Sequence, residues 1–208
     1  MTDVPPPHAY RVVTPRLMIR CWDPRDAPAL QQSIDRSIEH LTPWMPWAAL
    51  EPQTLDAKID LLRRFRGGFD YGQDFVFGIF SRDGSEVLGG TGLHPRVGGG
   101  GFEIGYWVDA KHAGRGYATE AAAAMTRVGF EILRLPFIEI RCRPENVRSA
   151  HVARKLGFTH EATLRQRLAF NGTNVDVMVF VMFPGEYAKS RAVTLPYEAY
   201  DAADRRLE

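Results

Sequence analysis

The chain has 208 residues, 45% of them hydrophobic and 25% charged, and its formal net charge is +1. These values predict one globular domain with a substantial core. The nearly balanced charge argues against a general nucleic-acid-binding or membrane-binding surface, and the apolar runs are far shorter than a membrane span, so we expect neither partner.

The N-terminus, the cysteines and the histidines indicate a cytoplasmic protein without a metal. The first ten residues have no basic flank and no apolar stretch of the signal-peptide type. Cys21 and Cys142 both fall in predicted strands, where buried free thiols suit a reducing compartment better than a disulfide does. The six histidines are scattered without metal-ligand spacing, and we therefore expect no metal.

The first third of the chain predicts a strand followed by two helices. The Pro-rich residues 1–9 are expected to be flexible. Apolar and polar residues alternate over residues 10–22, which predicts the first strand, and Asp23 is a plausible N-cap for the helix that follows. A second helix is predicted over residues 53–66, ending before a pair of glycines.

The rest of the chain alternates strand, helix and turn signals. A helical pattern covers residues 118–133, and Asn171 with the glycine after it is a hairpin signal between the last two strands. Residues 185–208 are polar, with a partly helical pattern and no expected role in the core. We therefore divide the chain into the flexible N-terminus, one domain over residues 10–185 and a tail over residues 186–208. The strands predicted after the first are residues 75–81, 86–94, 102–108, 137–142, 162–170 and 174–183.

The strongest functional signal is a glycine loop between the strand at residues 102–108 and the helix at residues 118–133. The loop contains Gly114 and Gly116, which let a backbone come close to a ligand. Backbone N–H groups in the first turn of a helix have no partner inside the helix, and together with the helix dipole they attract an anion. This order of elements predicts a phosphate-binding site.

The spacing of the loop distinguishes several kinds of phosphate site. A dinucleotide-binding loop would read G-x-G-x-x-G, but the residue three places after Gly116 is Thr119, and the nucleoside-triphosphate loop G-x-x-x-x-G-K-[ST] is absent. The sequence Lys111-x-x-Gly114-Arg115-Gly116 instead resembles the pyrophosphate loop Q/R-x-x-G-x-G/A of the GNAT acetyltransferases. Lys111 stands where that family usually has Gln or Arg.

A second segment strengthens this resemblance. Asn146 and Ser149 lie one helical turn apart after the strand at residues 137–142, so their side chains share a face. The GNAT family places an asparagine here against the pantetheine arm of acetyl-CoA. The helix that follows is expected to end at Gly157, which is a typical helix C-cap.

A third segment narrows the resemblance to one branch of the family. Residues 161–180 resemble the terminal hairpin of the RimJ/RimL-like, ribosomal-protein-type acetyltransferases, with Ala162 in place of the usual Gly. Residues 14–20 and 41–48 resemble the same branch. The resemblance covers about residues 10–185.

Strands and helices around a central strand–helix–strand unit predict an α+β fold with a mostly antiparallel sheet. The resemblance implies the GNAT fold, a mixed sheet of about seven strands flanked by helices. In that fold strands four and five splay apart, and acetyl-CoA enters the V-shaped gap as cosubstrate. The cofactor-binding residues that the resemblance implies are Val108, Asp109, Ala113, Gly114, Arg115, Gly116, Tyr117, Ala118, Thr119, Asn146, Ser149 and Arg154.

Acetylation of an amine needs a base for the amine and a proton donor for the leaving thiolate. Glu103 is the candidate base, because many GNAT enzymes use a glutamate in this strand; the alternative is a solvated carboxylate or a salt bridge, and Glu161 is a weaker candidate. Other GNAT branches use a tyrosine seven residues after the Asn as the acid, but Ala153 occupies that position here. Ser149 is therefore the candidate donor, and the alternative is that it only lines the cofactor channel or caps its helix.

Three residues are candidates for substrate binding. Trp44 and Trp47 lie in the region that covers the substrate mouth in this fold, and His94 follows the third strand on the expected acceptor side. Ordinary packing between helices is the alternative for the two tryptophans.

The acceptor amine is the least determined part of the predicted reaction. The α-amine of a protein has a pKa of about 7.7–8.0, against about 10.4 for lysine, and it therefore needs a weaker base to remove its proton. We expect a protein N-terminal α-amine, with a small-molecule amine such as an antibiotic, polyamine or amino acid as the alternative. A non-catalytic acyl-CoA-binding module and a dinucleotide-binding oxidoreductase are rival classes. The sequence leaves both a monomer and a homodimer open.

Overall fold

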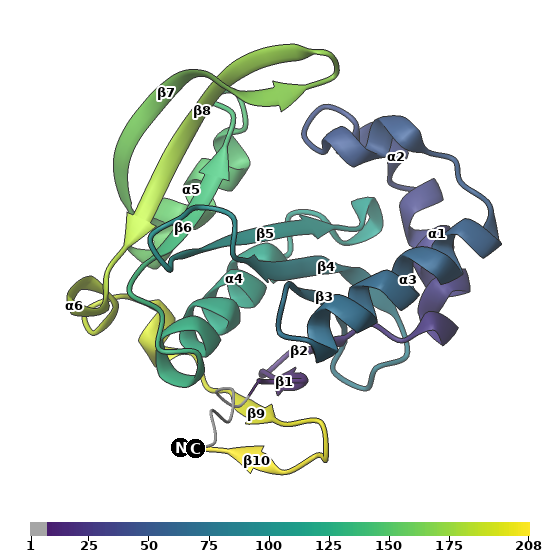
Figure 1. The fold of residues 1–208 in the computed structure, drawn as a ribbon, viewed down its shortest axis with the longest axis horizontal. Helices are drawn as coiled ribbons and strands as arrows, with labels where there is room; N and C mark the ends of the chain where they lie inside the picture. The colour runs from purple at the N-terminus through teal and green to yellow at the C-terminus, as the bar shows by residue number, and fades with distance from the viewer. Residues whose placement is uncertain (1–7) are drawn as a thin grey trace.

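The computed structural model describes residues 8–208 and shows one mixed sheet of ten strands flanked by helices (Figure 1). The strands are β1 (Arg11–Val13), β2 (Leu17–Cys21), β3 (Phe75–Ser81), β4 (Val87–His94), β5 (Phe102–Val108), β6 (Ile138–Cys142), β7 (Thr159–Phe170), β8 (Thr173–Met182), β9 (Glu198–Tyr200) and β10 (Arg206–Leu207). The helices are α1 (Ala27–Asp35), α2 (Ile38–Leu41), α3 (Leu55–Asp70), α4 (Tyr117–Arg127), α5 (Val147–Leu156) and α6 (Pro184–Tyr187).

The order of strands across the sheet is β10-β9-β1-β2-β3-β4-β5-β6-β8-β7. Neighbouring strands are antiparallel, except that β5 and β6 are parallel. The predicted α+β class with a mostly antiparallel sheet is confirmed. The sheet has ten strands where about seven were expected, because the first predicted strand is a hairpin and the tail contributes two strands.

The prediction that residues 10–22 form a single strand is wrong. They form β1 and β2, which pair with each other across a tight turn. At that turn the Thr14 hydroxyl accepts a hydrogen bond from the N–H of Leu17 at 3.1 Å, and Pro15 has no N–H to continue a ladder. Buried and partly exposed residues alternate on both sides of the turn, so the sequence pattern resembles that of a single strand.

Helix α3 runs past its predicted end at residue 66. Gly67 and Gly68 lie inside the helix although glycine is a poor helix former. The next residue, Phe69, is fully buried and packs edge-on against Phe75 and Phe77, with ring centroids 5.3 and 4.9 Å away. This tertiary packing outweighs the unfavourable propensity of the two glycines.

Several local predictions are confirmed. The side chain of Asp23 caps the 3₁₀ turn that leads into α1. Gly157 ends α5 with a φ of +94°, and Asn171 has a φ of +47° in the turn between β7 and β8. Cys21 and Cys142 are both buried and free.

The parallel strands β5 and β6 separate soon after they meet. They pair only at Phe102 with Ile138 and at Glu103 with Glu139. From Gly105 onwards β5 pairs with β4 alone, so a gap opens between β5 and β6. The predicted splay of these two strands is confirmed.

Buried side chains form a cluster on each face of the sheet. On one face α4 and α5 cover the larger cluster, which includes Ile104 of β5. On the other face α1 and α3 cover a smaller cluster around Trp22 and Phe80. Because side chains alternate along a strand, Glu103 and Gly105 point away from α4, toward what we call the α1 face.

The tail is part of the sheet, so the expectation that it has no role in the core is wrong, whereas its partly helical pattern agrees with α6 and with the 3₁₀ turn Ala192–Thr194. Strand β9 pairs with β1, and β10 pairs with β9, which extends the sheet at its β1 edge. Tyr187, Ala192 and Ala199 are buried in the larger cluster. Without the tail, β1 would be an unpaired edge strand, and β9 pairs with that edge. A single sequence does not reveal which edge of a sheet is free.

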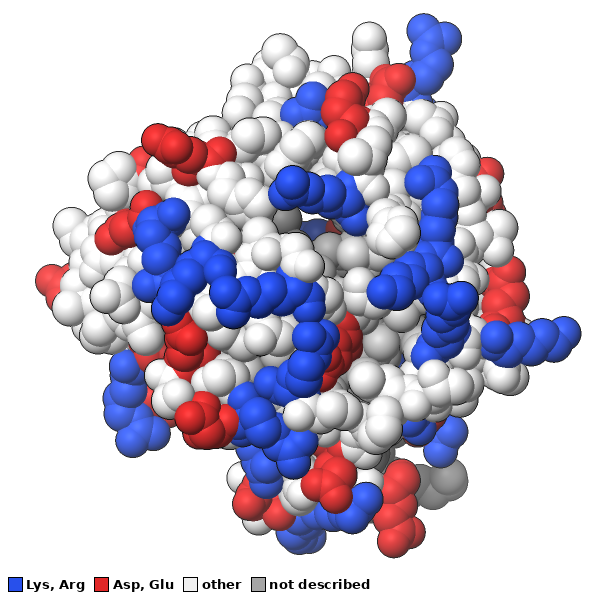
Figure 2. Space-filling model, turned by 180° about the vertical axis from the view of Figure 1, so that it is seen from behind, with Lys and Arg blue, Asp and Glu red and all other residues white. Residues whose placement is uncertain are grey.

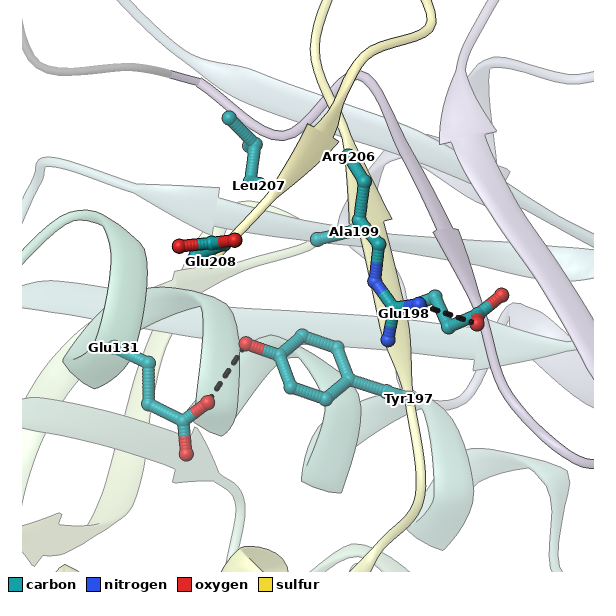
Figure 3. A pocket seen from close by; sticks show the side chains of 7 residues that line it. All are labelled: Glu131, Tyr197, Glu198, Ala199, Arg206, Leu207 and Glu208. Carbon is teal, nitrogen blue, oxygen red and sulfur yellow. Dashed lines mark hydrogen bonds and ion pairs between the residues drawn. The ribbon is translucent and has the colours of Figure 1, made fainter.

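Glu131 anchors this tail. It lies in the π-helical turn Val128–Ile132 that continues α4, and it accepts hydrogen bonds from the hydroxyls of Tyr187 and of Tyr197, the latter at 2.7 Å (Figure 3). Burial opposes its ionisation, but these hydroxyls and Arg127 outweigh burial and hold the pKa of Glu131 below its usual range. The pocket in Figure 3 therefore belongs to the attachment of the tail.

Within residues 8–208, no helix is long and apolar enough to cross a membrane. The same part of the chain contains no group of three or more His, Cys, Asp or Glu side chains placed to hold a metal ion. Of the residues expected to be flexible, 1–7 lie outside the described part of the chain, and Ala9 is buried.

Candidate active site

The loop between β5 and α4, residues 109–119, presents a row of free backbone donors; we call it the anion loop. Gly114 and Gly116 have φ angles of +78° and +80°, which turn the chain into the helix. No hydrogen bond in the described chain engages the N–H groups of residues 114–119. A Cβ on Gly114 would meet nothing within 4 Å, so the loop is open on this side. Free donors at a helix N-terminus can bind an anion.

The start of the anion loop is fixed to α1. Asp109 is fully buried, and its carboxylate accepts hydrogen bonds from Ser33 and Arg36, each at 2.6 Å. The hydroxyl of Ser37 accepts a hydrogen bond from the N–H of Ala110 at 3.0 Å. The carboxylate of Asp109 thus faces α1, and this residue contributes to a ligand site by holding the loop in place.

Arg16 and Glu120 form a network at the anion loop that the sequence did not reveal. Arg16 donates from Nε to Glu120 at 2.6 Å and from Nη1 to the carbonyl of Arg115 at 2.9 Å. The hydroxyl of Thr14 donates to the same buried Glu120 at 2.6 Å. The Arg16 guanidinium also lies 4.8 Å from the centroid of the Tyr117 ring. This arginine compensates a carboxylate that would otherwise repel an anion at the start of α4.

The other basic side chains of the anion loop differ in whether an acidic partner engages them. Lys111 pairs with Glu86 at 2.8 Å, so its ammonium is directed away from the loop glycines. Arg115 is exposed. On the rear face of the molecule, Lys and Arg side chains border a hollow near the centre (Figure 2). A positively charged border of this kind favours an anionic ligand.

The structure brings most of the predicted cofactor-binding residues together, but Arg154 lies apart from them. Val108, Asp109 and residues 113–119 lie in sequence around the end of β5 and the start of α4. Asn146 is the N-cap of α5. Arg154 lies two helical turns further along α5, with its guanidinium 5.2 Å from the centroid of the Phe180 ring.

Ser149 faces β5 across the gap between β5 and β6. Its N–H donates to the side chain of Asn146 at 3.1 Å, so Asn146 rather than Ser149 caps the helix. Its hydroxyl lies 2.9 Å from the hydroxyl of Tyr106. Burial raises the pKa of Tyr106 above its usual range, which keeps that hydroxyl protonated. The site therefore holds a neutral hydroxyl pair that can donate to a thiolate.

Glu103, the candidate base, is held by an arginine. It is only 8% exposed, and its two carboxylate oxygens accept from Nε and Nη2 of Arg96 at 2.9 and 2.8 Å. The hydrogen bonds that Arg96 donates to the Glu103 carboxylate raise the pKa of the Arg96 guanidinium. The salt bridge that was the alternative reading of Glu103 is present in the structure.

The three candidate substrate-binding residues border the α1 face at different places. His94 is the register partner of Glu103, and its Nδ1 lies 2.6 Å from Asp74. Trp47 packs edge-on against Trp107 of β5, with ring centroids 5.9 Å apart. These contacts place an imidazole and an aromatic wall beside the open part of β5.

Trp44 lies where the segment after α2 approaches the β7–β8 hairpin, which arches toward α2 in Figure 1. Arg143 bridges the two elements, because it donates to the carbonyl of Pro43 at 3.2 Å and its guanidinium lies 4.7 Å from the Phe170 ring centroid. The same guanidinium lies 6.0 Å from the Trp44 ring centroid. Arg143 therefore links the segment after α2 to the end of β7.

The sequence and the fold are similar to those of known acetyltransferases. Residues 16–159 match the model of the acetyltransferase (GNAT) domain family. The chain is 35% identical over 118 residues to the uncharacterized N-acetyltransferase p20 of Bacillus licheniformis, a match that spans 56% of this chain and 66% of that relative, just under two thirds of its length.

Two further relatives match over more of their length. The chain is 28% identical over 167 residues to the ribosomal protein uS5-alanine N-acetyltransferase of Escherichia coli (strain K12), which spans 78% of this chain and 84% of that relative. The solved structure of Mycobacterium smegmatis RimJ in complex with CoA-disulfide superposes with a TM-score of 0.78 at 27% identity, over 89% of this chain and 91% of that one.

Proposed function

The chain belongs to the GNAT acetyltransferase family, and we propose that it transfers the acetyl group of acetyl-CoA to a primary amine, with a protein N-terminal α-amine as the acceptor. The observation that carries this proposal is the row of free N–H groups over residues 114–119, next to the gap between β5 and β6. The donors suit the pyrophosphate of acetyl-CoA, and the gap suits its extended pantetheine arm.

The residues of the gap support direct transfer in a ternary complex. The amine nitrogen bonds to the thioester carbonyl carbon, the C–S bond breaks, and the thiolate takes up a proton. The proposed proton donor to that thiolate is Ser149, a role that its 2.9 Å contact with the Tyr106 hydroxyl supports. Burial raises the pKa of Cys21 to about 12 and also raises that of Cys142, so neither thiol is an activated nucleophile.

Two observations support a protein α-amine as the acceptor. One relative that spans 78% of the chain is named for acetylating the alanine of a ribosomal protein. An α-amine, with a pKa of about 7.7–8.0, also needs little help from a base, and the carboxylate of Glu103 is engaged by Arg96. The buried free cysteines support a reducing compartment such as the cytoplasm.

Mass spectrometry of peptides incubated with the protein and acetyl-CoA tests the proposal. Peptides with a free N-terminus should gain an acetyl group at the α-amine, whereas the same peptides with a blocked N-terminus and an internal lysine should react far more slowly. Faster transfer to polyamines, amino acids or aminoglycosides would favour a small-molecule acceptor. Tight binding of acetyl-CoA, but not of NAD, without transfer to any amine would favour a non-catalytic acyl-CoA-binding module.

A further inference from the structure

Two hydrogen-bonded side-chain pairs lie next to each other on the α1 face, at the point where β5 leaves β6. His94 on β4 is the register partner of Glu103 on β5. His94 pairs with Asp74, and Glu103 pairs with Arg96. The two pairs differ in whether an acceptor atom remains without a hydrogen bond: Glu103 uses both oxygens, whereas His94 uses one ring nitrogen.

Both carboxylate oxygens of Glu103 are engaged by one arginine. They accept charge-assisted hydrogen bonds from Arg96, and the side chain of Glu103 is 11% exposed. Bidentate pairs of a guanidinium and a carboxylate are strong, so Glu103 is held in place by this pair.

His94 has one ring nitrogen held and the other free. Nδ1 lies 2.6 Å from a carboxylate oxygen of Asp74, and no hydrogen bond within the described residues engages Nε2. A carboxylate at Nδ1 favours the tautomer that carries its proton there, which leaves Nε2 as an acceptor. Nε2 is therefore available to take a proton from a ligand.

Glycines on two strands let the imidazole lie flat against the sheet. A Cβ on Gly92 would come within 2.6 Å of Nε2 of His94, and a Cβ on Gly105 within 3.3 Å. Gly105 lies just beyond Glu103, the last residue of β5 that pairs with β6. Nε2 thus lies over the open part of β5, at the edge of the gap that suits the thioester arm.

We propose that His94 is the general base for the acceptor amine and that Asp74 is its positioning residue, an inference that rests on the proposed acetyl transfer. The ammonium gives a proton to Nε2, and the free amine then attacks the thioester carbonyl carbon. The imidazolium returns the proton to solvent while Asp74 stays ionised. In balance, an ammonium and a thioester give an amide, a thiol and one proton.

Asp74 supplies the carboxylate that lies within hydrogen-bond distance of the imidazole. The carboxylates that β5 and β6 carry next to it form ion pairs, Glu103 with Arg96 and Glu139 with Arg141. Loss of the Asp74 carboxylate should therefore change the tautomer and the orientation of the His94 ring.

Rate profiles of single variants test the proposal. His94→Gln should lower kcat/KM for an α-amine peptide by about 10²-fold near neutral pH, and the deficit should shrink above pH 8, where an α-amine with a pKa of about 8 deprotonates unaided. Asp74→Asn should lower kcat about 10-fold and leave KM unchanged, because the carboxylate that orients the His94 ring is lost. His160→Gln, at an exposed histidine on β7, is the matched control and should keep the wild-type profile. Acetyl-CoA affinity should not change in any of the three.

A second measurement does not depend on turnover. The ¹⁵N spectrum of the His94 imidazole should show Nδ1 as the protonated nitrogen in the wild type, and protonation of Nε2 instead would overturn the proposal even if Asp74→Asn failed to fold. An unchanged rate profile in His94→Gln, or a larger loss in Glu103→Gln, would also overturn it. Those results leave the proposed function standing if the wild type acetylates amines. A wild type without turnover on any amine contradicts the proposed function, and the role of His94 falls with it.

Discussion

The anion loop and the α1 face, which we propose belong to one ligand site, differ in the groups that they offer to a ligand. The loop offers backbone N–H groups over residues 114–119, while nearby side chains such as Lys111 and Asp109 are engaged elsewhere. The α1 face offers side chains, above all His94, over a floor of glycines. The loop should therefore tolerate the loss of an exposed side chain such as that of Arg115 but not an obstruction, whereas the α1 face should respond to the loss of a single functional group.

Obstruction of the loop should have the largest effect on binding. A Cβ at Gly114 would meet nothing within 4 Å, so Gly114→Trp has space at this atom, and its indole would cover the free donors. We expect the affinity for acetyl-CoA, measured by calorimetry, to fall by at least about 100-fold, or about 2.8 kcal/mol.

Gly98→Trp is the matched control for this variant. Gly98 has a φ of +81° and is also open around its Cβ position, but it lies in the turn before β5, so the backbone strain is similar without the obstruction. Equal losses in Gly114→Trp and Gly98→Trp, or no loss in either, would show that the anion loop is not where acetyl-CoA binds.

A single hydroxyl in the gap should matter next. Ser149→Ala removes the group placed to protonate the leaving thiolate, and we expect kcat to fall by about 10-fold to 100-fold with little change in acetyl-CoA affinity. Val147→Ala, at a position 69% exposed on the same helix, should leave kcat unchanged. If Ser149→Ala instead weakens acetyl-CoA binding and spares kcat, the serine only lines the cofactor channel.

Arg16 is a side chain that supports the backbone donors of the anion loop, so its loss should affect acetyl-CoA binding although the loop binds through N–H groups. Arg16→Ala leaves the buried carboxylate of Glu120 uncompensated beside the anion loop, and we expect acetyl-CoA to bind about 10-fold more weakly. The double variant Arg16→Ala/Glu120→Gln should recover most of that affinity because the repelling charge is gone. No recovery would mean that the arginine acts by direct contact with the cofactor. Arg25→Ala, at a side chain 90% exposed, serves as the control.

The tail should affect stability without affecting either region. Because the folded pKa of Glu131 lies below that of an unfolded glutamate, about 4.3, its contribution is complete above that pH and is lost as pH falls through the folded pKa. Glu131→Gln should lower the free energy of unfolding by about 1 kcal/mol at neutral pH, and this difference should vanish in acid. Urea midpoints across pH test this, and a difference that persists in acid would contradict it.

Features encoded by neighbouring residues could be predicted from the sequence. The cap at Asp23 and the helix end at Gly157 were predicted because they depend on local backbone geometry, whereas the splay of β5 and β6 was implied by the resemblance to the GNAT family. The free donors of the anion loop belong to the same class, since a glycine turn before a helix is enough to create them.

Contacts between distant residues could not be predicted from one sequence. The sequence shows that Arg16 and Glu120 are present but not that their side chains meet across 104 positions. The same holds for Asp74 with His94, and for Glu131, to which the tail is attached. Where side-chain packing opposes a local signal, packing decides, as in the two glycines inside α3 that precede the buried Phe69.

An NMR titration of ¹⁵N-labelled protein with acetyl-CoA tests the central claim most directly, because it observes each backbone N–H. The account predicts the largest shifts at residues 114–119, smaller ones at Gly105 and Ser149, and none at residues 198–207 of the tail. Saturable shifts centred on the tail pocket, with the anion loop unchanged, would contradict it.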